Sequence, residues 1–290
     1  MARKSATSFE GPANGHATTP SSLKDEKPTM TSPLQETTTN SSAADVDDEE
    51  KPIPFDPSLL PNGSRDLSFI GLQAFFLGIT LATSILLTLY FLSITSAWWR
   101  LSSFVTCLSI FHFLEYYTTA RYNAPSTRAS SFLLFNNGSA YAAAHTLATL
   151  EIILSIIFPK YHAAGLYRPL TLTAGVTFIL LGQTVRSIAM KQAGTNFNHI
   201  VATEHRQNHI LVTRGMYAYL RHPSYFGFFW WAIGTQLLVG NKVCLVGYAV
   251  VLWNFFYTRT IVEERNLVKF FGQQYEEYRK RTGTLIPFVP

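Results

Sequence analysis

The chain has 290 residues, of which 47% are hydrophobic and 14% charged, whereas an ordinary soluble domain has about 25% charged residues. This composition favours a membrane protein over a soluble domain. Residues 1–66 hold 6 Lys and Arg against 11 Asp and Glu, and residues 67–290 hold 17 against 7. Because the cations of the second part lie between long apolar runs and form no single stripe, the charge pattern excludes a nucleic-acid-binding module.

Residues 1–60 are rich in Ser, Thr, Pro and acidic residues, and the run at 45–50 reads Asp-Val-Asp-Asp-Glu-Glu. Such a segment buries too little apolar surface to offset the entropy lost on ordering. We therefore predict a disordered N-terminal tail over residues 1–60, followed by a membrane domain over residues 61–290.

The membrane domain contains six apolar segments. A helix needs about 20 apolar residues to cross the roughly 30 Å hydrocarbon core of a bilayer. The six segments are 67–92, 98–118, 138–158, 167–190, 224–240 and 242–262. The last two segments almost touch in the sequence, which predicts a tight helical hairpin. Because lipid offers no hydrogen-bond partners to an open backbone, we predict an all-α fold, a polytopic helical bundle with about six transmembrane helices.

The cations of the connecting loops predict the orientation. An even number of spans places both termini on one side of the membrane, and cytosolic loops carry an excess of Lys and Arg. The loops on the side of the termini hold Arg121, Arg128, Lys191, Arg206, Arg214 and Arg221. The opposite loops hold Arg100, Lys160, Arg168 and Lys242. We therefore expect both termini and the long loop 191–222 to face the cytosol.

A few ionisable residues lie inside the apolar segments. His112 and Glu115 are three residues apart in the second segment, and we interpret them as partners in structural hydrogen bonds rather than as catalytic groups. Arg186 and Lys191, at the end of the fourth segment, are interpreted as snorkelling or capping cations. The two cysteines of the chain have no metal-like spacing, so we expect no metal site.

Polar residues gather in two stretches, 191–225 and 259–266, which flank the terminal hairpin. The loop that follows the fourth segment alternates amides and imidazoles, as in GTNFNH at 194–199 and HRQNH at 205–209. A loop of this length between two spans is usually functional or disordered. Its Gly, Tyr and Phe content favours an ordered loop that holds a ligand.

The run RHPSYFG at 221–227 predicts the start of a helix. Pro223 suits the first helical position, because its missing N–H costs nothing there, and His222 is then the capping residue. The free N–H groups and the positive dipole at such a helix start suit a carboxylate or another anion. Gly227 and Gly234 allow another helix or a flat ligand to approach closely, and we favour helix packing.

Arg259 and Glu263 lie at the end of the last apolar segment, four residues apart on one helical face. On an exposed helix they would form an ordinary ion pair worth about 0.3–0.5 kcal/mol. Near a membrane boundary, however, ionisable groups are costly and tend to mark substrate sites. The position therefore favours a functional role.

In their order and spacing, several of these segments resemble the isoprenylcysteine carboxyl methyltransferases. The segments that carry the resemblance are GTNFNH at 194–199, HILVTRGMY at 209–217, RHPSY at 221–225, GTQ at 234–236, RTIVEE at 259–264 and FFGQQYEEY at 270–278. Looser similarity extends upstream to EYYTTA at 115–120 and SFLL at 131–134. The resemblance covers about residues 110–290 and implies a catalytic region over about residues 180–290.

The resemblance implies an enzyme that uses S-adenosyl-L-methionine to methyl-esterify the C-terminal isoprenylcysteine of CaaX-processed proteins. In that family the cofactor lies in a pocket roofed by the long loop and the C-terminal helix. The residues implied to contact the cofactor are His209, Ile210, Leu211, Val212, Tyr217, His222, Pro223, Ser224, Tyr225 and Glu263. Arg259 is implied to be the catalytic residue that contacts the substrate. One family contact, often a Gln, falls near Ala202, whose methyl group cannot make the hydrogen bonds of an amide.

The resemblance also implies partners and a location. The expected partners are farnesylated or geranylgeranylated cysteine C-termini of proteins such as small GTPases, together with membrane lipid and without nucleic acid. The expected location is the endoplasmic reticulum membrane. A prenyl chain is lipid-soluble, at about 0.8 kcal/mol per buried CH₂, and can enter sideways between helices.

Methyl esterification of a C-terminal carboxylate needs no general base, because its unperturbed pKa of about 3.3–3.7 leaves it ionised at neutral pH. Arg259 fits as a bidentate clamp on that carboxylate. A membrane phospholipid N-methyltransferase is the alternative function, but its amine must lose a proton, which favours a base over an Arg clamp. A sterol reductase that binds a nicotinamide cofactor usually has more spans, and a non-catalytic membrane scaffold has no need of Arg259 and Glu263.

Overall fold

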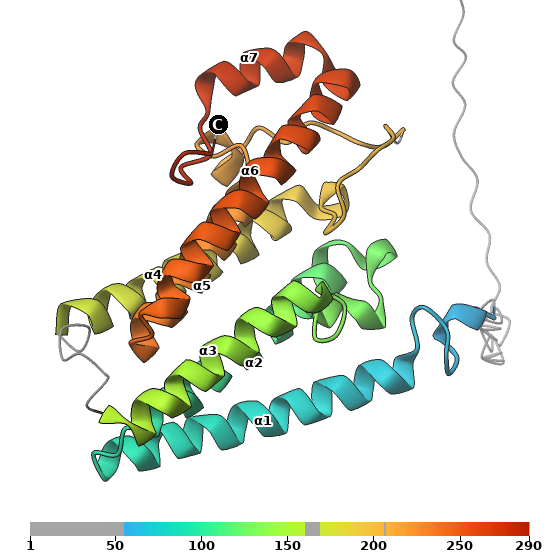
Figure 1. Cartoon of the computed structure of the whole chain (residues 1–290). Helices are drawn as coiled ribbons and strands as arrows, with labels where there is room; N and C mark the ends of the chain where they lie inside the picture. The colour runs from blue at the N-terminus through green and yellow to red at the C-terminus, as the bar shows by residue number, and fades with distance from the viewer. Residues whose placement is uncertain (1–54, 160–168, 206, 290) are drawn as a thin grey trace, which may run out of the picture. The chain divides into compact units, whose positions relative to one another are not determined.

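The computed structural model of the chain describes residues 55–159, 169–205 and 207–289 (Figure 1). The predicted all-α fold is confirmed, since these ranges contain no strand and only an isolated bridge between Leu220 and Gly283. The helices are α1 (Leu67–Ser93), α2 (Trp99–Tyr122), α3 (Gly138–Ile157), α4 (Pro169–Ala193), α5 (Pro223–Val239), α6 (Val243–Phe271) and α7 (Gln273–Arg281). Short 3-10 helices are η1 (Pro57–Leu59), η2 (Ala124–Ser126), η3 (Ala129–Phe132), η6 (Gly194–Asn196) and η7 (Gly215–Ala218). Most of the predicted tail, residues 1–54, lies outside the described residues, as do Lys160, Arg168 and Arg206.

Among the described helices, four are long and apolar enough to cross a membrane: α1, α3, α6 and the segment Pro169–Asn196, which joins α4 and η6. The protein is therefore a multi-pass membrane protein. The other two predicted spans are also helices, but α5 has only 17 residues and α2 buries many polar side chains. The number of six spans stays a prediction.

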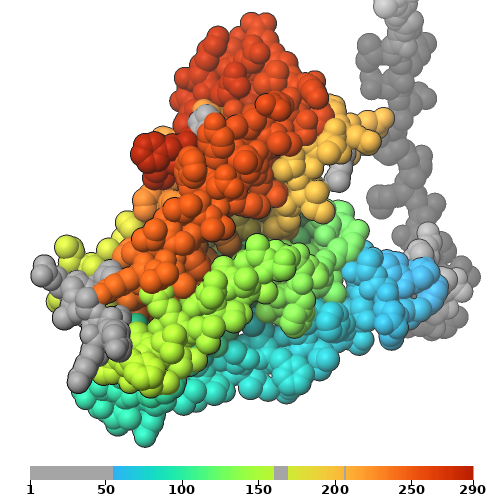
Figure 2. Space-filling model, in the orientation of Figure 1, coloured from blue at the N-terminus to red at the C-terminus, as the bar shows by residue number. Residues whose placement is uncertain are grey.

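The outer face of α1 has the character of a lipid-facing surface. Figure 2 shows this helix, in cyan, open to the surroundings, and its large apolar side chains are exposed, such as Phe75 at 63%. An exposed apolar face of this length is costly in water but not in hydrocarbon. On the inner face, Thr88 donates to the Ser102 hydroxyl and Thr106 donates to the Ser84 hydroxyl, both at 2.9 Å. These bonds tie α1 to α2.

The helices α4 and α5 pack with their backbones in direct contact. Gly182 on α4 faces Gly227 on α5, and a Cβ at Gly182 would lie 2.5 Å from the Gly227 carbonyl oxygen. A Cβ at Gly234 would lie 2.8 Å from the Gly175 carbonyl oxygen. The interpretation of Gly227 and Gly234 as packing residues is confirmed. This contact fixes the start of α5 against the end of α4.

The predicted hairpin between the last two segments is confirmed. Gly240 ends α5 in the left-handed conformation with φ 71°, and α6 begins three residues later. Glu151 of α3 accepts the backbone N–H groups of Lys242, Val243 and Cys244 at 2.6, 2.9 and 2.7 Å. A carboxylate at this helix end satisfies donors that have no partner within the helix.

The ionisable residues inside the bundle have buried partners. His112 lies with Nδ1 2.8 Å from the Phe132 carbonyl oxygen, which confirms its interpretation as a structural hydrogen-bonding residue. The interpretation of Arg186 as a snorkelling or capping cation is wrong. Arg186 is only 7% exposed and so does not reach the membrane surface. Its buried charge is compensated by Glu115 on α2 and by the Phe111 ring, 5.5 Å from the guanidinium carbon.

Candidate active site

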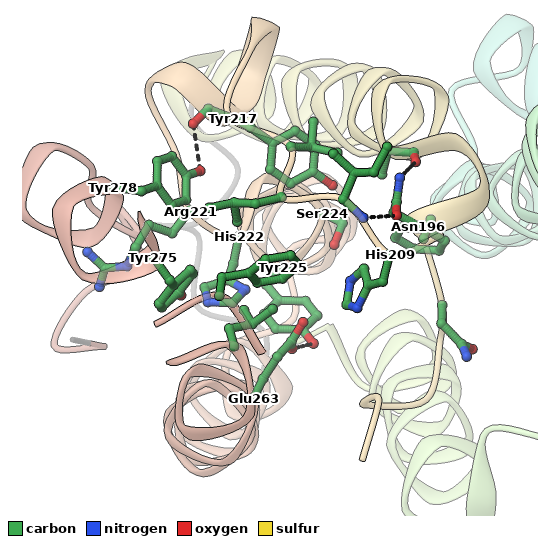
Figure 3. A pocket seen from close by; sticks show the side chains of 18 residues that line it. Asn196, His209, Tyr217, Arg221, His222, Ser224, Tyr225, Glu263, Tyr275 and Tyr278 are labelled. Carbon is green, nitrogen blue, oxygen red and sulfur yellow. Dashed lines mark hydrogen bonds between the residues drawn. The ribbon is translucent and has the colours of Figure 1, made fainter. Parts of the chain in front are cut away.

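A pocket is formed where the ends of α4, α5 and α6 meet the cap, defined as the loop 194–222 together with α7 (Figure 3). Its empty volume, which includes space open to solvent, is about 680 Å³. Nine of the ten residues assigned to the cofactor line it: His209, Ile210, Leu211, Val212, Tyr217, His222, Ser224, Tyr225 and Glu263. Pro223 does not line the pocket and is buried at the first position of α5.

Nine further lining residues were not selected from the sequence. They are Ala193, Asn196, Phe197, Asn198, Arg221, Leu267, Phe271, Tyr275 and Tyr278. Seven of them belong to the runs 194–199, 221–225 and 270–278, so membership of those runs was the available signal. Ala193 and Leu267 lie outside the runs, and no sequence feature pointed to them.

Side-chain bonds to the backbone hold the loop of the cap in place. Asn196 accepts the backbone N–H of Ile210 at 2.9 Å, which joins the first and middle parts of the loop (Figure 3). Asn123, at the end of α2, donates to the Phe197 carbonyl oxygen at 2.9 Å. The loop is therefore fixed both to itself and to the helical bundle.

The start of α5 is as predicted, with His222 as the capping residue and Pro223 at the first helical position. The His222 ring stacks on Tyr225 with centroids 5.1 Å apart and planes 5° apart. Its Nε2 lies 3.3 Å from Glu264 Oε1, and that carboxylate also accepts Arg221 Nε at 2.8 Å. The start of α5 is thus tied to α6 beside the pocket.

Arg259 and Glu263 are joined through a tyrosine and form no direct ion pair in the described structure. Arg259 Nε donates to the Tyr225 hydroxyl oxygen at 2.6 Å, and that hydroxyl donates to Glu263 Oε2. Arg259 Nη2 donates to the His199 carbonyl oxygen. No described residue bonds to Nη1, so Nη1 and the remaining N–H of Nη2 can bind a carboxylate. Arg259 therefore lies behind the pocket wall and reaches it through Tyr225.

The helix α7 closes the pocket by binding backbone carbonyls of the loop. The Tyr278 hydroxyl donates to the Tyr217 carbonyl oxygen at 2.6 Å and to that of Leu220 at 3.3 Å. The backbone N–H of Arg221 donates to Gly283 at 2.9 Å. Burial raises the pKa of Tyr278 to about 12 and also raises the pKa of Tyr217. Both hydroxyls are therefore protonated, and able to donate, at neutral pH.

Tyr275 on α7 presents an uncommitted hydroxyl to this region. The residue is 1% exposed, and its hydroxyl oxygen has no hydrogen-bond partner among the described residues. Burial raises the pKa of Tyr275 well above its usual range, so the hydroxyl stays a donor at neutral pH. Because buried polar groups are normally satisfied, this hydroxyl on a lining residue is a candidate donor to a ligand.

Ala202 lines a smaller pocket that shares His209 and Glu263 with the first. Its backbone carbonyl accepts Asn266 Nδ2 at 3.0 Å. The contact that a Gln side chain would supply near this position has no counterpart in the methyl group of Ala202, but the backbone holds the loop to α6.

Comparison with known proteins shows which family the chain resembles in sequence and fold. Residues 175–269 match the isoprenylcysteine carboxyl methyltransferase family. The fold is similar to the solved structure of the eukaryotic intramembrane Ras methyltransferase, isoprenylcysteine carboxyl methyltransferase. The TM-score is 0.65 with 34% sequence identity, over 74% of each chain.

Two relatives extend the similarity over most of the membrane domain. The protein-S-isoprenylcysteine O-methyltransferase of Saccharomyces cerevisiae is 49% identical over 189 residues, which cover 64% of this chain and 79% of the yeast protein. The Homo sapiens protein of the same name is 40% identical over 220 residues, which cover 76% of this chain and 75% of the human protein. The chain belongs to the isoprenylcysteine carboxyl methyltransferase family.

Proposed function

We propose that this protein is a protein-S-isoprenylcysteine carboxyl O-methyltransferase, which uses S-adenosylmethionine to methyl-esterify the C-terminal isoprenylated cysteine of CaaX-processed proteins. Membership of the family supports the reaction. The observation that carries the roles of the residues is the hydrogen-bonded row Arg259–Tyr225–Glu263. It connects a cation near the end of a membrane helix to two residues that line the pocket.

The pocket residues fit S-adenosylmethionine in their chemistry. The cofactor has a flat base, a hydroxylated ribose and an amino-acid end with both charges, and the pocket offers aromatic rings, apolar side chains and charged groups of both signs. We assign cofactor binding to His209, Ile210, Leu211, Val212, Tyr217, His222, Ser224, Tyr225 and Glu263, with Pro223 shaping the helix start. The free donor of Tyr275 supports a bound ligand on the side of α7.

When bound, S-adenosylmethionine supplies a methyl group carried on a positively charged sulfur. The acceptor carboxylate is ionised at neutral pH, so no residue of the chain has to remove a proton. Arg259 binds the carboxylate through Nη1 and Nη2, while Tyr225 and the His199 carbonyl hold the guanidinium in place. The cap covers part of the site, and exclusion of water by the bound ligands would strengthen the electrostatic contacts that orient the carboxylate.

For the natural substrates we propose prenylated small GTPases, bound at the endoplasmic reticulum membrane with the active site on the cytosolic face. A soluble cofactor and the soluble body of such a substrate are both reached from the cytosol. The loops on the side of the site are richer in cations, which supports this orientation. Lys160 and Arg168, which count for the opposite side, lie outside the described residues.

The direct test is transfer of a labelled methyl group from S-adenosylmethionine to N-acetyl-S-farnesylcysteine in membranes that contain the full chain. We expect label in a base-labile ester, and none with N-acetylcysteine, which lacks the prenyl chain. Label in a base-stable phospholipid, with no ester formed, would favour the phospholipid N-methyltransferase instead.

A further inference from the structure

The carboxylate of Glu115 on α2 accepts three hydrogen bonds, two from α4 and one from the cap. The residue is 0% exposed. Arg186 of α4 binds its carboxylate with both Nε and Nη2, the second at 2.8 Å. His199 of the cap approaches with Nε2 2.9 Å from Oε2. Since an ionised carboxylate only accepts, Nε2 of His199 is the donor.

Each of these two partners leads to a residue that holds Arg259. The backbone carbonyl of His199 accepts Arg259 Nη2. Arg186 Nη1 donates to the Ser224 carbonyl oxygen at 3.1 Å, in the first turn of α5. The next residue is Tyr225, whose hydroxyl accepts Arg259 Nε. Both acceptors that fix the guanidinium of Arg259 are therefore connected to the Glu115 carboxylate, one through His199 and the other through Arg186.

We propose that Glu115 is a positioning residue for the substrate-binding guanidinium of Arg259, an inference that rests on the proposed function. Glu115 does not line the pocket, so its action is indirect. It holds His199 and the start of α5 in one arrangement, and these two hold the Arg259 guanidinium with Nη1 free. The long Arg side chain is then ordered before the carboxylate arrives, so ordering it costs nothing on binding.

The alternative explanation, a purely stabilising ion pair, is weaker on physical grounds. A buried ion pair often contributes little net stability, because desolvation of both charges offsets their attraction. The pair here also has a third member from the cap, where His199 is only partly buried. A pair that served the bundle alone would have no need of a residue in the ligand-binding loop.

The experiment measures kcat/KM for N-acetyl-S-farnesylcysteine and, in parallel, competition by its C-terminal carboxamide, which has no charge for Arg259 to bind. Glu115→Gln keeps the shape of the side chain and removes its charge. We expect kcat/KM for the carboxylate to fall on the order of 10- to 100-fold, as for a small misplacement of a binding group. We expect unchanged affinity for the carboxamide and for S-adenosylmethionine.

Two further variants separate positioning from folding. His199→Ala breaks only the arm through the cap and leaves the Glu115–Arg186 pair intact, so it should fold and still lose preference for the carboxylate. His199→Gln restores an N–H close to the position of Nε2 and should recover part of that preference. Glu151→Gln is the matched control. Glu151 is a carboxylate on α3 that binds the start of α6, far along the helix from Arg259, and none of its hydrogen bonds connects it to the Arg259 guanidinium. Glu151→Gln should leave the preference unchanged.

The inference is overturned if folded Glu115→Gln and His199→Ala retain the wild-type preference for carboxylate over carboxamide, or if they lose affinity for both ligands equally. Failure of the proposed function gives a different result, namely no methyl transfer by the wild-type protein to any prenylcysteine. The two failures are therefore distinguishable.

Discussion

The α4–α5 pair and the cap are held together by different kinds of contact. In the pair, a Cβ at Gly182 or Gly227 would lie 2.5 or 2.6 Å from the carbonyl oxygen of the other glycine. In the cap, α7 reaches the loop through directed bonds, such as those from the Tyr278 hydroxyl to the Tyr217 and Leu220 carbonyl oxygens. The first contact depends on the shape of two backbones, and the second on single side-chain atoms.

This difference separates contacts that determine folding from contacts that determine ligand binding within the C-terminal part of the chain. A close-packed backbone contact tolerates no added atom, because neither helix can move without unpacking the other. A hydrogen bond at the rim of a pocket can be removed singly at a cost of about 0.5–1.5 kcal/mol. Substitutions in the pair should therefore strongly lower the amount of folded protein. Single substitutions in the cap should cost little stability, and those at lining residues should act on binding by folded protein.

The largest expected effect is that of Gly182→Ala. The new methyl group would lie 2.5 Å from the Trp231 backbone nitrogen as well as from Gly227, and neither backbone can yield. We expect destabilisation of roughly 1–3 kcal/mol or more, measured as the thermal midpoint of the detergent-solubilised protein. The control is Gly71→Ala on α1, where nothing lies within 4 Å of the new Cβ. An unchanged midpoint for Gly182→Ala would show that the pair is not rigid.

The next largest effect is expected for Arg259→Ala, which should lose methyltransferase activity but still fold. Arg259→Ala should lower esterification at least about 100-fold, as for removal of a group that binds the reacting charge, and should largely preserve S-adenosylmethionine binding. Wild-type turnover by this variant would remove Arg259 from its role as the clamp.

Glu263→Ala should act on the cofactor instead. Loss of a charged lining group that accepts the Tyr225 hydroxyl should weaken S-adenosylmethionine roughly 10- to 100-fold, equivalent to about 1.5–3 kcal/mol. Calorimetric titration of the purified protein measures the change. Glu277→Ala, an exposed carboxylate on α7 that does not line the pocket, is the control and should bind normally. Equal affinity for the two variants would exclude Glu263 from the cofactor site.

Local sequence rules predicted the parts of the site that depend on neighbours in the chain. Pro223 at the first position of α5 follows from its fixed φ and missing N–H, which act within one helical turn. Arg259 and Glu263 were selected because they lie four positions apart, on one face of a helix. Tyr225, which lies between them in space, precedes Arg259 by 34 residues, and no helical period reports such a distance.

The pairing of Glu115 with Arg186 likewise could not be predicted from local sequence rules. Each was recognised as ionisable and intramembrane, but their pairing depends on how α2 and α4 pack, across 71 residues of sequence. Without that contact, Arg186 could only be interpreted through its position near a helix end, which led to the wrong role. The interaction between distant helices is set by their packed surfaces, and the sequence of one segment does not contain it.

Tyr275→Phe provides a finer test of the cap, because stability and binding should change in opposite directions. Removal of a buried hydroxyl without a partner should leave the thermal midpoint unchanged or raise it slightly. Removal of a ligand's hydrogen-bond donor should weaken S-adenosylmethionine by about 0.5–1.5 kcal/mol, up to roughly tenfold in Kd. If binding is unaffected while stability rises, the hydroxyl faces no ligand.

The smallest expected effect is that of Tyr278→Phe, which removes both bonds from α7 to the loop. We expect a loss of roughly 1 kcal/mol of stability near neutral pH. Because the folded-state pKa of Tyr278 is about 12 and an unfolded Tyr has a pKa of about 10, this contribution is fully present below about pH 10. It is then lost as the pH rises towards 12. The thermal midpoints of wild type and variant should therefore differ at about pH 8 and converge as the pH approaches 12. Equal midpoints at about pH 8 would mean that ring packing, which Phe retains, and not the hydroxyl holds α7 on the loop.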